Sequence, residues 1–263
     1  MALLECNFYS ESLSLSTSMT VILPQNTTSQ IGMKNVAAGS RHKTLYLLHG
    51  LSDDHTIWAR RTSIERYVAP LGLAVIMPAV GRSFYTDMKH GGAYETFVAD
   101  ELPAIAGEFF PLSAKREDTY IAGLSMGGYG AFKLALNHPE RYCAAASLSG
   151  VLDLMRRIDA PEARLRPDFV NVFGADLKPD RARDDLLVVL KQLKKNGASV
   201  PRLYACCGEE DTLYEQNVTF REHAATVGVE LTWQSDPRFA HTWDYWDLRI
   251  QSVLDWMLSP AAI

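Results

Sequence analysis

The sequence lacks a long apolar run, a basic stripe and a leader-like start. No stretch approaches the roughly 20 apolar residues that a membrane-spanning helix needs, so we expect no membrane association. The first residues include Glu5 and no basic segment, which argues against a signal peptide. A net charge of −5 gives no reason to expect nucleic acid as a partner. We therefore expect a cytoplasmic protein.

Cysteine is also scarce. The four cysteines, Cys6, Cys143, Cys206 and Cys207, show no C-x-x-C spacing, so the sequence predicts free thiols and no metal site. Three of them lie in apolar, strand-like stretches, where cysteine usually behaves as a small buried hydrophobe. The chemistry of this chain is therefore expected to depend on other side chains.

The patterning that is present indicates an α/β protein. The chain has 263 residues, of which 47% are hydrophobic and 22% charged, and can form one domain with a sizeable core. Strands are expected at 2–9, 13–24, 44–48, 73–77, 119–122, 142–148, 202–207 and 229–234, and helices at 94–110, from 126, and at 184–195, 212–227 and 243–258. We predict an antiparallel pair at the start of a mostly parallel central sheet, with helices on both faces.

A nucleophile motif lies in the middle of the chain. Gly123-Leu124-Ser125-Met126-Gly127 is a G-x-S-x-G, preceded by a short buried strand and followed by a helix. In such an elbow the serine occupies a strained strand-to-helix turn, and the glycines keep other side chains out of it. The motif predicts Ser125 as the nucleophile and the N–H of Met126 as an oxyanion donor. A plain glycine-rich turn is the alternative.

An earlier loop offers the second oxyanion donor. His49-Gly50-Leu51 follows a compact apolar strand, and an H-G loop at this place supplies a backbone N–H in α/β-hydrolases. We expect that donor to be Leu51, whereas the surroundings of His49 suit a tight loop better than a catalytic base. Trp58 and Tyr85 are candidates for substrate contact. Core packing is an equal alternative for Trp58, and a purely structural role is the alternative for Tyr85.

The acid and the base are expected near the ends of the last two strands. Asp211 stands in an acidic turn after 202–207, with Glu210 as the alternative acid. His241 stands on a loop after the last strand, whereas His223 lies within a predicted helix. The order Ser125, Asp211, His241 is that of α/β-hydrolases, so the sequence predicts that fold and a Ser-Asp-His triad that forms an acyl-enzyme.

Several motifs resemble one family, the esterase D / S-formylglutathione hydrolase group, and within it the bacterial tributyrin esterases (acetylesterases). They are Leu48-His49-Gly50-Leu51, Ser83-Phe84-Tyr85-Thr86-Asp87, Glu101-Leu102-Pro103, Gly123-Leu124-Ser125-Met126-Gly127-Gly128-Tyr129-Gly130 and Ala240-His241-Thr242-Trp243. The resemblance spans about residues 2–258. It implies hydrolysis of short acyl esters (acetyl to butyryl) without a cofactor, and a homo-oligomer, dimer or tetramer.

Three alternative functions stay open. S-formylglutathione hydrolases often carry a cysteine shortly after the H-G loop, and here that stretch is Ser52-Asp53-Asp54-His55, which weakens the thioesterase interpretation. An esterase of acylated carbohydrates (acetyl or feruloyl esters) is the second alternative. A non-catalytic binding module is the third, and the complete triad argues against it.

Residues 150–183 depart from the pattern of the rest. They are rich in arginine, aspartate and proline without a steady apolar period. We expect one domain over 1–263, with 150–183 as a small cap insertion beside the active site. The arginines Arg156, Arg157, Arg164 and Arg166 could meet an acidic substrate, but a solvated face is the favoured interpretation.

Overall fold

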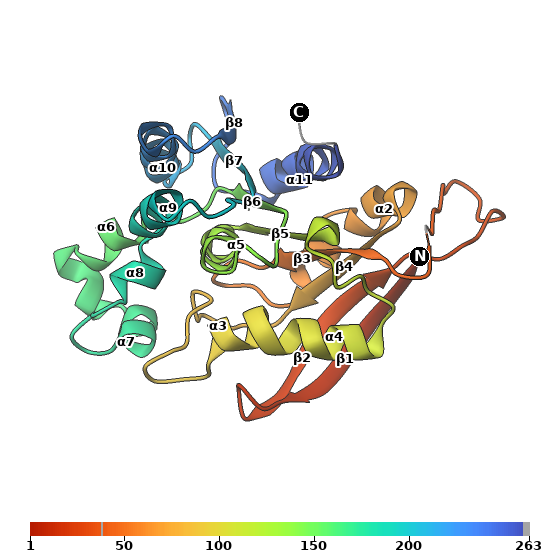
Figure 1. Ribbon diagram of the computed structural model, residues 1–263, viewed down its shortest axis with the longest axis horizontal. Coiled ribbons are helices and arrows are strands. Elements are labelled where there is room, and N and C mark those ends of the chain that lie inside the picture. Colours follow the sequence, from red (N-terminus) through yellow and green to blue (C-terminus); the bar gives the residue numbers. More distant parts are fainter. Residues whose placement is uncertain (38, 260–263) are drawn as a thin grey trace.

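A computed structural model describes residues 1–37 and 39–259 of the chain (Figure 1). Eight strands form one sheet in the order β1-β2-β4-β3-β5-β6-β7-β8. The strands are β1 (Ala2–Ser10), β2 (Leu15–Leu23), β3 (Lys43–Leu48), β4 (Leu73–Pro78), β5 (Thr119–Leu124), β6 (Ala144–Leu148), β7 (Arg202–Gly208) and β8 (Leu231–Asp236). β1 and β2 pair antiparallel, β2 pairs antiparallel with β4, and all later pairs are parallel. The predicted mostly parallel sheet is confirmed.

Helices cover both faces of the sheet because its central strands are apolar on both sides. One core layer lies under α4, α5, α9 and α10, and the other under α1, α2 and α11 (Figure 1). The first set comprises α4 (Leu102–Phe109), α5 (Met126–Asn137), α9 (Leu186–Lys195) and α10 (Tyr214–Val227). The second comprises α1 (Ile57–Arg61), α2 (Ile64–Val68) and α11 (Trp243–Leu258). This arrangement is the α/β-hydrolase fold that the order of the site residues predicts.

Several element boundaries differ from the sequence prediction. The second strand begins at Leu15, because residues 11–14 form a turn in which Ser14 has a positive φ of 54°. The helix expected over 94–110 consists of α3 (Tyr94–Thr96), a π-helical turn (Phe97–Glu101) and α4. The wide turn ends two residues before Pro103, which has no N–H to donate.

The helix expected over 184–195 is divided. α8 (Arg181–Asp184) ends at Asp185, whose carboxylate accepts hydrogen bonds from the N–H groups of Leu187 and Val188 at 3.1 and 3.4 Å. This N-cap starts α9 as a separate helix, since it satisfies two backbone donors that have no helical partner.

The segment 150–183 folds as short helices grouped at one end of the molecule (Figure 1). They are α6 (Leu154–Ile158), a 3₁₀ turn (Pro161–Leu165), α7 (Pro167–Phe173) and the first residues of α8. Met155, Phe169 and Val172 bury their side chains in the same core as α5. The two other 3₁₀ turns are Ala69–Leu71 and Arg116–Asp118. In the described ranges, no helix is both long and apolar enough to cross a bilayer.

Candidate active site

Ser125 occupies a sharp turn between β5 and α5. Its backbone has φ 54° and ψ −116°, a strained conformation for a residue with a side chain. A Cβ at Gly123 would lie 2.3 Å from the carbonyl oxygen of Gly127, and one at Gly127 would lie 2.5 Å from that of Leu48. Only glycine fits at both positions, so the geometry is that of a nucleophile elbow.

His241 and Asp211 form a hydrogen-bonded pair. Nδ1 of His241 lies 2.8 Å from Oδ2 of Asp211, and the other carboxylate oxygen accepts the N–H of Leu213 at 2.8 Å. Burial by itself raises the pKa of the Asp211 carboxyl, but the hydrogen bond and charge of His241 and the Leu213 N–H outweigh it, so the pKa is lowered. Asp211 is therefore a buried carboxylate that holds the imidazole with Nε2 facing away from it.

The rival residues are placed elsewhere. The Glu210 side chain is exposed and has no hydrogen bond to His241. Nε2 of His223, on α10, lies 2.8 Å from the carbonyl oxygen of Leu187. The structure thus brings Asp211 and His241 together and leaves the alternatives of the sequence prediction apart.

Ser125 and His241 share one cavity of about 220 Å³. Its walls come from the elbow, the loop after β3, the cap segment and the turn after β7. The lining residues are Leu51, Phe84, Ser125, Met126, Val151, Arg157, Arg166, Thr212, Leu213 and His241. The backbone N–H groups of Leu51 and Met126 donate no hydrogen bond to any residue that the structure describes. Two unused donors at the wall beside a serine have the composition of an oxyanion hole.

Trp58 and Tyr85 lie behind this cavity rather than on its wall. Both side chains are buried, at 1% and 0% exposure. Trp58 Nε1 donates to the carbonyl oxygen of Leu48 at 3.0 Å, and the Tyr85 hydroxyl donates to that of His49 at 2.9 Å. Both residues thus hold carbonyl groups of residues 48–51, which we call the oxyanion loop, and their contact with a substrate stays a prediction.

His49 fixes the same loop from within. Its Nδ1 lies 2.7 Å from the carbonyl oxygen of Gly50, and its Nε2 accepts the N–H of Val80 at 3.1 Å. These partners require the neutral tautomer with the proton on Nδ1. Burial lowers the pKa of His49 to about 4, so the ring is uncharged at neutral pH. With both nitrogens engaged, His49 has no atom available to act as a base.

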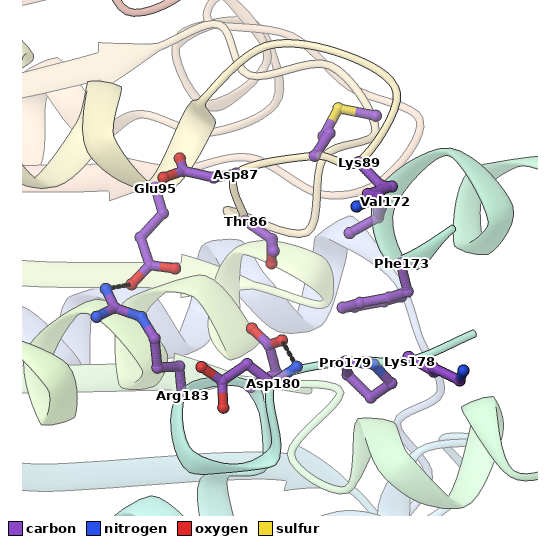
Figure 2. Close-up of a pocket in the computed structure, with 12 residues that line it drawn as sticks. Thr86, Asp87, Lys89, Glu95, Val172, Phe173, Lys178, Pro179, Asp180 and Arg183 are labelled. Carbon is purple, nitrogen blue, oxygen red and sulfur yellow. Dashed lines mark hydrogen bonds and ion pairs between the residues drawn. The ribbon is translucent and has the colours of Figure 1, made fainter. Parts of the chain in front are cut away.

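A buried ion cluster lies at the elbow helix α5. Lys133 of α5 is fully buried, and its Nζ lies 2.7 Å from Thr86 Oγ1, 2.9 Å from Glu95 and 2.7 Å from Asp184. Arg183 pairs with Glu95 at 2.7 Å, so two cations balance two carboxylates. Figure 2 shows the pocket of about 500 Å³ beside this cluster, which shares no lining residue with the Ser125 cavity.

Two of the four arginines that the sequence offered as possible contacts of an acidic substrate lie on the cavity wall. Arg157 and Arg166, which were expected on a solvated face, line the cavity with Ser125. Four arginines lie between positions 156 and 166, and no local pattern separates those that face the cavity from those that face water. Their placement depends on how the cap helices pack. In the part of the chain that the structure describes, no three His, Cys, Asp or Glu side chains are grouped to hold a metal.

The chain is similar in sequence and structure to esterases and other serine hydrolases. Residues 10–257 match the family described as "Putative esterase". The chain is 29% identical to an acetyl esterase of Caldicellulosiruptor saccharolyticus, over 98% of each chain. It resembles the structure of FphF, a fluorophosphonate-binding serine hydrolase of Staphylococcus aureus, with 33% identity, a TM-score of 0.87 and coverage of 98% and 99%. An S-formylglutathione hydrolase (FrmB) of the same organism gives 32% identity, a TM-score of 0.82 and the same coverage.

Proposed function

We propose that Ser125, Asp211 and His241 form the catalytic triad of this chain. The chain belongs to the esterase family and is a serine carboxylic ester hydrolase. The observation that carries this proposal is the 2.8 Å contact between His241 and Asp211 at the wall of the cavity that contains Ser125. A nucleophile, a base and an orienting acid then occupy one site in the roles that acyl transfer needs.

The mechanism follows from this geometry. His241 Nε2 takes the proton of Ser125 Oγ as the oxygen attacks the acyl carbonyl, and Asp211 stabilises the imidazolium. The N–H groups of Leu51 and Met126 bind the oxyanion, each with a contribution of about 3–4 kcal/mol to the transition state. The alcohol leaves with the proton from His241. Water activated by the same nitrogen then releases the acid.

We propose short acyl esters, acetyl to butyryl, as the substrates. The cavity of about 220 Å³ is walled by Phe84, Val151 and Leu213, and this volume suits a small acyl group. A thioester of the S-formylglutathione type is the second candidate, because a hydrolase of that activity is 32% identical over 98% of this chain. Both substrates pass through the same acyl-enzyme chemistry.

Three further features are proposed on the same basis. We propose one domain with 150–183 as a small cap, supported by the packing of Phe169 and Val172 into the common core. The family resemblance supports a dimer or tetramer, and the absence of a signal-like segment among the first residues supports a cytoplasmic location. Light scattering of the purified chain tests the oligomer.

Initial rates on 4-nitrophenyl esters from acetate to dodecanoate test the function. We expect a steep preference for acetate to butyrate that disappears in Ser125→Ala and persists in Ser259→Ala, a change at the exposed end of α11. A fluorophosphonate should label the wild type and not Ser125→Ala. Labelling that persists in folded Ser125→Ala would reject the nucleophile, and rates that rise toward dodecanoate would reject the small acyl pocket.

A further inference from the structure

The wall of the Ser125 cavity includes a guanidinium that has no partner among the described residues. Arg157, on α6, lines the cavity and is half-buried. Its side chain makes no hydrogen bond or ion pair with any residue of the described ranges, whereas Arg166, the other partly buried arginine of the cap, is paired with Asp168. A cation that is partly removed from water without a counter-ion is costly, so an unpaired one in a cleft needs an explanation.

Arg166, the other arginine of the wall, has its partner already. It donates to both carboxylate oxygens of Asp168, at 2.5 and 3.3 Å, and its guanidinium lies 4.2 Å from the centre of the Phe169 ring. Arg82 adds a contact of 3.4 Å to the same carboxylate. Asp168 is thus shared by two arginines, and neither of its oxygens contacts Arg157.

The two charged side chains that line the cavity, Arg157 and Arg166, are both cations. Burial and repulsion by Arg166 lower the pKa of the Arg157 guanidinium from its ordinary value, and an arginine side chain stays charged in proteins. No carboxylate lines the cavity, and Asp211 lies behind His241. An entering anion would therefore meet an excess of positive charge at the wall, in a cleft of reduced dielectric.

We propose that Arg157 is a specificity-determining residue, and that the preferred substrates are esters carrying a carboxylate close to the scissile bond. Its planar fork can donate two parallel hydrogen bonds to such a group. This inference rests on the proposed esterase function, and it specifies that the preferred ester is an anion. The carboxylate could belong to the acyl part or to the leaving alcohol, and both parts can be tested separately.

Two matched pairs of esters distinguish these sources. For the acyl part, 4-nitrophenyl hemiglutarate is compared with 4-nitrophenyl pentanoate, in which a methyl group replaces the carboxylate. For the alcohol part, 4-acetoxybenzoate is compared with 4-acetoxybenzamide. The quantity measured is the ratio of kcat/KM for the anionic ester to that for the neutral one. Using a ratio removes changes that affect both esters equally.

The variants are Arg157→Gln and Arg157→Lys, with Arg156→Gln, an exposed neighbour on the same helix, as the control. In at least one pair we expect Arg157→Gln to lower the ratio about tenfold, since a charge-assisted hydrogen bond at a partly exposed site is lost. Arg157→Lys should give an intermediate ratio, and Arg156→Gln should match the wild type. Added salt should lower the anionic rate in the wild type more than in Arg157→Gln.

The outcomes separate the two proposals. Equal ratios for wild type and Arg157→Gln in both pairs, with similar responses to salt, would overturn the role of Arg157 while the hydrolysis of neutral esters supports the esterase. A wild type that is folded and hydrolyses neither member of either pair would count against the proposed function itself. If Arg157→Gln fails to fold, Arg157→Lys and the salt dependence of the wild type decide the question.

Discussion

Acidification should destabilise this protein through His49, a residue of the oxyanion loop. The ring is 1% exposed, its Nε2 accepts the N–H of Val80, and its Nδ1–H donates to Gly50. Protonation of Nε2 would place a second N–H against the Val80 donor and bury a charge. The pKa of His49 is accordingly lowered from 6.5 to about 4, mainly by burial.

The sign follows from which state binds the proton first. In the unfolded chain this histidine is protonated below pH 6.5, whereas in the folded protein it stays neutral until about pH 4. Between these values the unfolded state carries the extra proton, so the free energy of unfolding falls as the pH falls, by about 1.4 kcal/mol per pH unit. The loss is about 2 kcal/mol at pH 5 and about 3 kcal/mol below pH 4.

Urea unfolding at pH 7 and pH 5 measures this effect. His49→Gln keeps a donor and an acceptor but cannot titrate, and His90→Gln, at an exposed position, is the control. Because carboxylates also titrate, the informative quantity is the difference between variants. We expect wild type and His90→Gln to lose about 2 kcal/mol more between the two pH values than His49→Gln. Equal losses in all three proteins would refute the reasoning.

Three other substitutions test the supports of the site. Lys133→Met should reduce the free energy of unfolding by about 3–5 kcal/mol, because Glu95 and Asp184 lose their shared cation, and a loss under about 1 kcal/mol in urea unfolding would contradict this. Tyr85→Phe should lower kcat about tenfold by releasing one carbonyl of the oxyanion loop, at a stability cost of only about 1 kcal/mol, with unchanged kcat as the contrary result. Asp211→Asn should lower kcat by about 10⁴-fold in single-ester kinetics, and a loss below about tenfold would exclude it as the orienting acid.

Much of the fold and of the candidate site could be predicted from the sequence, because both depend on local residue patterns. Strand-like apolar segments alternating with helices predict the parallel sheet, and glycines at 123 and 127 are required by a turn only five residues long. In a parallel sheet the carboxyl ends of the strands meet at one edge. Residues after β5, β7 and β8 could therefore be assigned to one site before any coordinate was known.

Helix boundaries and the hydrogen-bond partners of buried side chains could be predicted less well from the sequence. Asp185 divides a helix that the apolar pattern predicts as continuous, because capping depends on a single side chain. Trp58 and Tyr85 were candidates for substrate contact with a structural role as the alternative, and each donates its polar atom to the oxyanion loop. An aromatic residue with one polar atom has the same sequence signature in both roles, and only the position of its partner distinguishes them.

By itself, the sequence determined the family, the fold, and the serine, aspartate and histidine expected to do the chemistry, since each depends on short motifs and their order. Only the tertiary structure decided that Asp211 rather than Glu210 contacts His241, that Lys133 is buried between carboxylates, and that Arg157 lines the cavity. These features depend on distances between side chains remote in sequence. Such distances are set by the packing of helices against the sheet, which no local pattern encodes.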